Sequence, residues 1–173
     1  EIYGEYASSK SLSVLIGTAI VMSLALVVTK ALAKNNNDSK LLFVNSYYII
    51  TRNFFISLII LFPITFLFQR DLSMTALFLI GFVFNEMIHV ALAFFQARGD
   101  FVTSSKQIFL RTVIYGIGAW IIVLQGFSII TLIFFQVFML GLFFIIAHIS
   151  IPKNEKVFEV KSTPHVKNSL QKS

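Results

Sequence analysis

The sequence predicts an all-α protein, a polytopic bundle of transmembrane helices, and three observations support this prediction. First, 57% of the 173 residues are hydrophobic and only 13% are charged, against about 25% charged residues in an ordinary soluble domain. Second, the mean hydropathy is +0.83. A chain this apolar has more apolar surface than a water-soluble domain of its size could bury. Third, the apolar residues form long continuous runs. A disulfide-stapled secreted domain is excluded because the chain has no Cys.

Five apolar segments are predicted to span the membrane, since a helix of about 20 residues crosses about 30 Å of hydrocarbon. Helices are expected because backbone polar groups in lipid must be satisfied within the segment. A β-barrel would show short alternating segments instead. Residues 1–150 are therefore expected to form the bundle, and the polar residues 151–173 a tail. The predicted spans are 12–32, 41–68, 74–97, 108–124 and 128–149.

The distribution of Lys and Arg predicts the orientation, because these residues are concentrated in cytoplasmic loops. Lys10 and Arg70 fall on the side expected to face outward, together with the N-terminus. The basic charge flanks membrane spans, and no RNA-binding motif or continuous basic face accompanies it, so no nucleic-acid partner is expected. Eleven of the 14 basic residues fall on the side expected to be cytoplasmic: Lys30, Lys34, Lys40, Arg98, Lys106, Arg111, Lys153, Lys156, Lys161, Lys167 and Lys172.

Ionisable residues inside a span are functional candidates, because burying them in lipid is costly. Glu86 is expected near the midplane of span 74–97, with Asn85 beside it and His89 three residues later on the same face. These three side chains could contact a sugar head group or form a protonation switch. The alternative is a structural hydrogen-bond network between helices.

Two arginines are candidates for binding phosphate, because the guanidinium group matches phosphate geometry. The inner membrane boundary of span 41–68 is expected near Ile49, so that Arg52 would lie only a few ångströms inside it and could alternatively extend its charged end to the membrane surface. Arg111 is expected at the cytoplasmic end of span 108–124, on one face with Tyr115 and Gly118. There it could attract an anionic lipid head group or simply anchor the helix.

Sequence motifs of enzymes and metal sites are missing. The chain lacks G-x-S-x-G, H-E-x-x-H and P-loop patterns. Its three histidines, His89, His148 and His165, are too scattered for an obvious metal site. The expectation is a protein that is not an enzyme and has no cofactor or metal, so that any transport would not be driven by ATP hydrolysis in this chain.

Two short motifs within this topology resemble a known family. The first is Tyr3-Gly4-Glu5-Tyr6-Ala7, which precedes a helix that ends in Thr29-Lys30-Ala31-Leu32-Ala33-Lys34. The second is Ala93-Phe94-Phe95-Gln96-Ala97-Arg98-Gly99-Asp100-Phe101, at the exit of a span. Together they resemble the O-antigen and capsular-polysaccharide flippases (Wzx-type) of the multidrug/oligosaccharidyl-lipid/polysaccharide exporter superfamily. The resemblance covers most of residues 1–149.

The resemblance implies an exporter-type fold with two lobes, of which this chain would be the N-terminal lobe without its first helix. It implies a flippase in the bacterial cytoplasmic membrane that moves a polyprenyl-pyrophosphate-linked oligosaccharide for surface polysaccharide synthesis. Its partners would be that lipid-linked oligosaccharide, membrane lipids, the missing C-terminal lobe and a polysaccharide polymerase. In this scheme Arg52 and Arg111 contact phosphate or acidic sugar, while Asn85, Glu86 and His89 shape the cavity.

Two alternatives remain open. One is an ion-coupled multidrug or metabolite antiporter of the same superfamily, in which Glu86 couples transport to protons or sodium. The other is a structural membrane subunit without a transport path.

Overall fold

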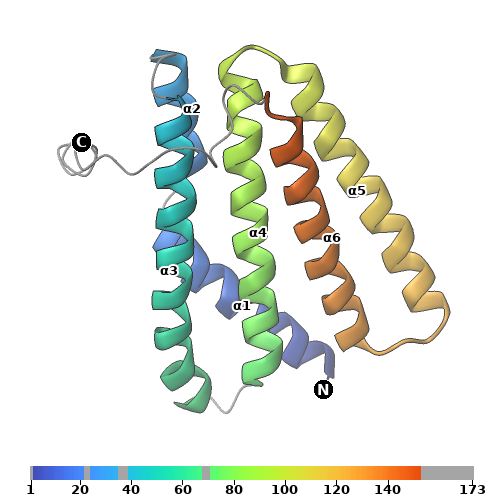
Figure 1. The fold of residues 1–173 in the computed structure, drawn as a ribbon. Helices are drawn as coiled ribbons and strands as arrows, with labels where there is room; N and C mark the ends of the chain where they lie inside the picture. The colour runs from blue at the N-terminus through green and yellow to red at the C-terminus, as the bar shows by residue number, and fades with distance from the viewer. Residues whose placement is uncertain (1, 22–23, 35–38, 68–70, 153–173) are drawn as a thin grey trace.

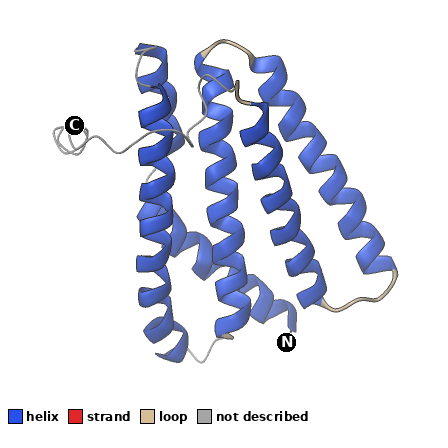
Figure 2. Cartoon of the chain, viewed as in Figure 1, coloured by secondary structure: helices blue, strands red, loops and turns tan. Residues whose placement is uncertain are grey.

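A computed structural model describes residues 2–21, 24–34, 39–67 and 71–152. The described residues contain helices and no strand, which confirms the all-α prediction (Figure 2). The tail predicted for 151–173 lies outside the described residues from position 153 onward. The helices are α1 (Ile2–Val21), α2 (Leu24–Lys34), α3 (Ser39–Leu67), α4 (Leu72–Ala97), α5 (Phe101–Leu124) and α6 (Ile129–Ser150).

Helix α4 is the centre of the bundle and contacts each of the other helices (Figure 1). Helices α3, α4, α5 and α6 run up and down side by side, whereas α1 crosses them obliquely. Half of the apolar window of α4 is buried, whereas none of the corresponding window of α5 is buried. Helix α5 therefore lies at the edge of the bundle, where most of its surface faces outward.

Within the described residues, four helices are long and apolar enough to cross a membrane: Leu42–Leu67 within α3, then α4, α5 and α6. Large apolar side chains such as Phe66 and Val102 lie exposed on their outer faces. Lipid tails would solvate this surface, because hydrocarbon is as apolar as these side chains. The ends of three predicted spans, 41–68, 74–97 and 128–149, agree with the helices within about two residues.

The first predicted span, 12–32, is not one described helix. Its residues are divided between α1, which ends at Val21, and α2, which begins at Leu24. Helix α1 also extends through the polar segment before residue 12. Small side chains let α1 approach α4 closely, as is common between membrane helices. Ser9, Ser13 and Gly17 share its buried face, and the Ser13 hydroxyl donates to the Thr75 carbonyl at 2.9 Å.

The fourth predicted span begins seven residues earlier than expected, at Phe101 instead of residue 108. The polar residues after Asp100 suggested a loop, but Asp100 caps a helix that includes them. Its carboxylate accepts the backbone N–H of Thr103 at 3.0 Å, which satisfies a donor that has no partner within the helix. This shift places Arg111 far from the end of the helix.

The two turns that flank α5 have the same design. Gly99 and Gly126 have positive φ angles, +75° and +69°, which glycine adopts without steric cost. In the first turn the N–H of Asp100 donates to the Phe95 carbonyl at 2.9 Å. This is the six-residue closure of a Schellman motif. A capping residue follows each glycine, and in the second turn it is Ser128. Both turns are thus specified by local sequence.

Candidate functional site

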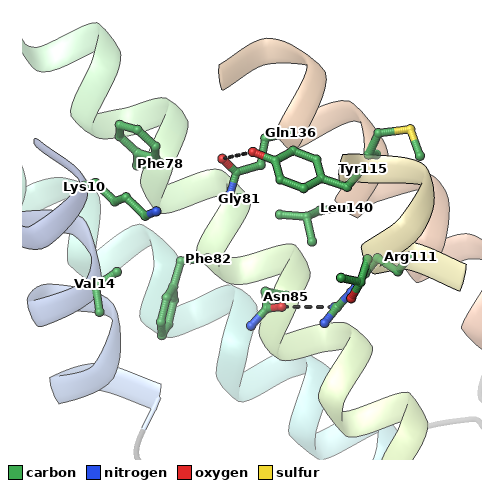
Figure 3. Close-up of a pocket in the computed structure, with 12 residues that line it drawn as sticks. Lys10, Val14, Phe78, Gly81, Phe82, Asn85, Arg111, Tyr115, Gln136 and Leu140 are labelled. Carbon is green, nitrogen blue, oxygen red and sulfur yellow. Dashed lines mark hydrogen bonds between the residues drawn. The ribbon is translucent and has the colours of Figure 1, made fainter. Parts of the chain in front are cut away.

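A cavity of about 320 Å³ lies within the bundle and is called the central cavity (Figure 3). Residues of α4 line the middle of the cavity, residues of α1 line one side, and residues of α5 and α6 line the opposite side. Its position matters because irregular polar surface within a membrane is tolerated where it lines a protected cavity. The lining residues are Lys10, Val14, Phe78, Gly81, Phe82, Asn85, Arg111, Thr112, Tyr115, Gln136, Met139 and Leu140.

Two cationic side chains line the central cavity from different helices, Lys10 on α1 and Arg111 on α5. The described lining contains no Asp or Glu. The Lys10 ammonium lies 5.8 Å from the centroid of the Tyr6 ring, within the range of a cation–π contact. The Arg111 guanidinium donates to Asn85 Oδ1 at 3.1 Å. The cavity therefore carries a positive charge that the described lining leaves unneutralised.

A second polar pair lies in the same wall. The Tyr115 hydroxyl on α5 donates to Gln136 Oε1 on α6 at 3.4 Å. The Tyr115 ring stacks on Phe135, with 6.1 Å between centroids and an interplanar angle of 15°. Gly118, about one turn further along α5, leaves room for the Phe135 ring. Phenol and amide groups can both donate and accept hydrogen bonds, so this wall suits a hydroxylated ligand.

Asn85 and Arg111 lie near the middle of their helices. At 1.5 Å per residue, Arg111 is about 15 Å along α5 from Phe101. Asn85 is about 20 Å along α4 from Leu72. The structure thus brings together two residues that the sequence analysis selected separately, and it places Arg111 well inside a helix instead of at a cytoplasmic end. A charge at this depth is costly and marks functional positions.

Glu86 and His89 are half-buried on α4, and neither lines the central cavity. His89 lies close enough to Arg111 for the two to interact electrostatically. Glu86 follows Phe82 by one helical turn, and Phe82 packs against Gly17 of α1. His89 therefore lies within electrostatic range of the cavity residue Arg111, and Glu86 lies one turn from Phe82 on the same side of α4.

Arg52 lies apart from the central cavity, on the exposed surface of α3. Its Nε and Nη2 atoms both donate to Asn53 Oδ1 at 3.3 Å. Arg52 is ten residues beyond Leu42, the start of the apolar part of α3, and thus about 15 Å inside it.

Three polar lining residues were not selected in the sequence analysis: Lys10, Thr112 and Gln136. Lys10 was assigned to a polar segment outside the membrane. It lines the cavity because that segment is part of helix α1. Gln136 had a usable signal, because it is the single amide side chain in a mostly apolar helix. Among the described residues, no group of three or more His, Asp or Glu side chains could hold a metal ion.

Comparisons with protein families, curated proteins and solved structures found no match to this chain. The class of the protein is therefore defined from its fold and its cavity alone. The chain is an α-helical membrane protein by the length and composition of α3, α4, α5 and α6. Within this class, its distinguishing feature is a positively charged cavity inside the bundle.

Proposed function

We propose that the protein is a flippase that carries the anionic head group of a lipid-linked oligosaccharide across the membrane. The single observation that supports this function is the central cavity, with Lys10 and Arg111 on different helices and no acidic residue in its described lining. Arg111 is half-buried and Lys10 is exposed. The partly buried guanidinium raises the energy of the empty cavity, because no acidic residue of the described lining offsets its charge or that of Lys10. An anionic ligand that enters between them would recover part of that energy.

The chemistry of the lining suits a pyrophosphate that carries sugars. The planar guanidinium of Arg111 can bind two phosphate oxygens at once, and the Lys10 ammonium adds a compact charge. Asn85, Tyr115 and Gln136 offer donors and acceptors for sugar hydroxyls. A volume of about 320 Å³ lies within the usual range of ligand pockets, about 300–1,000 Å³.

The lipid tail would stay in the bilayer during transport. The outward faces of α5 and α6 are apolar, with Phe109, Trp120 and Phe138 all exposed, so acyl chains can lie along them. Alternating access of a central site requires one helical bundle to rock against another. The proposal therefore includes a second bundle that completes the cavity, in the bacterial cytoplasmic membrane.

Binding of farnesyl pyrophosphate to the detergent-purified chain tests this proposal, with farnesol as the uncharged counterpart. We expect farnesyl pyrophosphate to raise the melting temperature more than farnesol does. Arg111→Gln and Lys10→Gln should each weaken its binding about tenfold or more, because a hydrogen bond to a charged group contributes about 1.5–3 kcal/mol.

Arg52→Gln is the matched control, since Arg52 is also an arginine within a membrane helix but lies outside the cavity. Its affinity should equal that of the unmodified chain. Equal stabilisation by farnesyl pyrophosphate and farnesol, or equal losses at positions 52 and 111, would contradict the proposal and favour a structural subunit.

A further inference from the structure

Helix α5 carries a line of polar side chains on one face, which we call the polar stripe: Ser104, Gln107, Arg111 and Tyr115. Their spacing of three or four residues places them above one another along the helix. The stripe is about 16 Å long. Ser104 is only 2% exposed, whereas Phe109, on another face of α5, is 68% exposed. The stripe therefore faces the bundle and the apolar residues face outward.

Three members of the polar stripe bond to neighbouring helices at successive levels. The Gln96 amide of α4 donates to the Ser104 hydroxyl at 3.3 Å. One level further, Arg111 donates to Asn85 of α4, and beyond it Tyr115 donates to Gln136 of α6. Polar groups thus follow α5 from its first turns, near the Arg98–Asp100 turn, to the central cavity.

At the level of Gln107, the polar stripe lies against apolar side chains of α4 and α6. There a second cavity, of about 10 Å³, is lined by Gln107, Arg111 and Ile108 together with three other apolar side chains. Its volume is about that needed for one water molecule. The three side chains are Ile88, Leu92 and Phe143, which are buried and are called the apolar constriction.

Arg111 connects the two cavities, because it lines both of them. On one side of Arg111 lies the central cavity, and on the other lies the small cavity, which the apolar constriction lines. Polar groups continue past the constriction to the Gln96–Ser104 hydrogen bond. If the polar stripe served only to attach α5 to the bundle, Gln107 would not be needed, because its side chain lines the second cavity.

We propose that the polar stripe is the path of the head group between the central cavity and the Arg98–Asp100 end of the bundle. This inference rests on the proposed flippase function. The head group, an anion rich in hydroxyls, exchanges hydrogen bonds from one helical turn to the next along α5. The apolar constriction closes the path in this structure, and separation of α5 from α4 opens it.

Single cysteines test the path, since the chain has no native Cys. Tyr115→Cys reports on the central cavity, Gln107→Cys on the closed part of the path, and Phe109→Cys on the outward face of the same helix. Each is treated in membranes with a water-soluble, membrane-impermeant maleimide. We expect rapid labelling at position 115, slow labelling at 107 and none at 109.

Removing the apolar constriction should change only one of these results. In the background of Leu92→Ala or Phe143→Ala, labelling at position 107 should rise several-fold. Position 109 should remain unlabelled, which shows that the bundle has not simply opened. If both backgrounds reduce the amount of protein in the membrane, Gln96→Ala provides the same test by removing the Gln96–Ser104 bond.

The outcomes separate this inference from the function on which it rests. No labelling at position 115 means that the central cavity is dry, and the flippase proposal fails with the path. If position 115 is labelled but labelling at 107 does not increase in any of the three backgrounds, the proposed path is wrong. The proposal of a hydrated central cavity is then unaffected. An increase at 109 that equals the increase at 107 also overturns it.

Discussion

Arg111 of α5 and Asn85 of α4 are 26 residues apart in sequence and are joined by a hydrogen bond of 3.1 Å. Both lie near the middle of helices that are long enough to cross a membrane. The amide oxygen fixes one edge of the guanidinium against α4. Arg111 also lines the central cavity.

Loss of the Asn85 amide should weaken the attachment of α5. We expect Asn85→Ala to lower the free energy of unfolding by about 1 kcal/mol, a typical value for a hydrogen bond between membrane helices. Unfolding in mixed micelles titrated with dodecyl sulfate, followed by circular dichroism, measures the change. Asn45→Ala is the control, because Asn45 is half-buried on α3 outside the cavity. A double-mutant cycle with Arg111→Met should give a coupling of similar size, and a coupling of zero would refute the pairing.

Two glycines in α5 form a matched pair. A Cβ at Gly118 would overlap the ring of Phe135, whereas a Cβ at Gly116 would meet nothing within 4 Å. Gly118→Ala should therefore destabilise the protein by about 1–3 kcal/mol through overpacking. Gly116→Ala should leave stability within about 0.5 kcal/mol or raise it, because alanine favours the helix. Equal effects in the same unfolding assay would mean that α5 does not pack on α6 at this point.

Asp100 should make stability depend on pH in the acid range. Hydrogen bonds from the Thr103 side chain and backbone N–H hold the pKa of the Asp100 carboxyl below its usual range. A lowered pKa in the folded state stabilises the protein above the unfolded value, about 3.9, and this contribution is lost as pH falls through the folded pKa. The melting temperature should therefore fall more steeply below about pH 4 than in Asp100→Asn, which keeps a capping oxygen without a charge. Identical pH profiles for the two proteins would show that the cap does not depend on ionisation.

The two ends of α5 should lie on opposite sides of the membrane. Ser105→Cys and Gln125→Cys are both exposed positions near these ends. Because basic residues flank the first end, it is expected to be cytoplasmic. An impermeant maleimide added to intact spheroplasts should label position 125 but not 105, and lysis should make both reactive. The reverse pattern would invert the orientation, and labelling of both before lysis would mean that α5 does not cross.

The sequence predicted the helices of this bundle better than their connections. Hydropathy alone located α3, α4 and α6, because a long apolar run in a chain of this composition can only be a buried or membrane helix. It failed at the start of α5, where Asp100 caps a helix whose first two turns contain the polar residues 103–107. Hydropathy also predicted one span over 12–32, and the described residues of that segment belong to two helices, α1 and α2.

The candidate site was predicted in part, and the reason is geometric. Asn85 and Arg111 were selected for their chemistry, and the structure brings them together. Their meeting could not be foreseen, because it depends on how α5 is rotated against α4. Arg52 was selected by the same rule but lies on an outward face. Lys10 was overlooked because its polar neighbours suggested a segment outside the membrane.

The two short turns that flank α5 limit how this helix can move. Only residues 98–100 join it to α4, and only residues 125–128 join it to α6. A shift of one turn along its axis, about 5.4 Å, would have to unwind a capped helix end. Rotation about its axis would carry Arg111 into hydrocarbon, at high cost. Tilting is the remaining motion. Because a short turn holds each end of α5, a tilt that moves one end away from α4 brings the other end closer to α4. The space between α5 and α4 can therefore open at either end in turn, but not at both ends together.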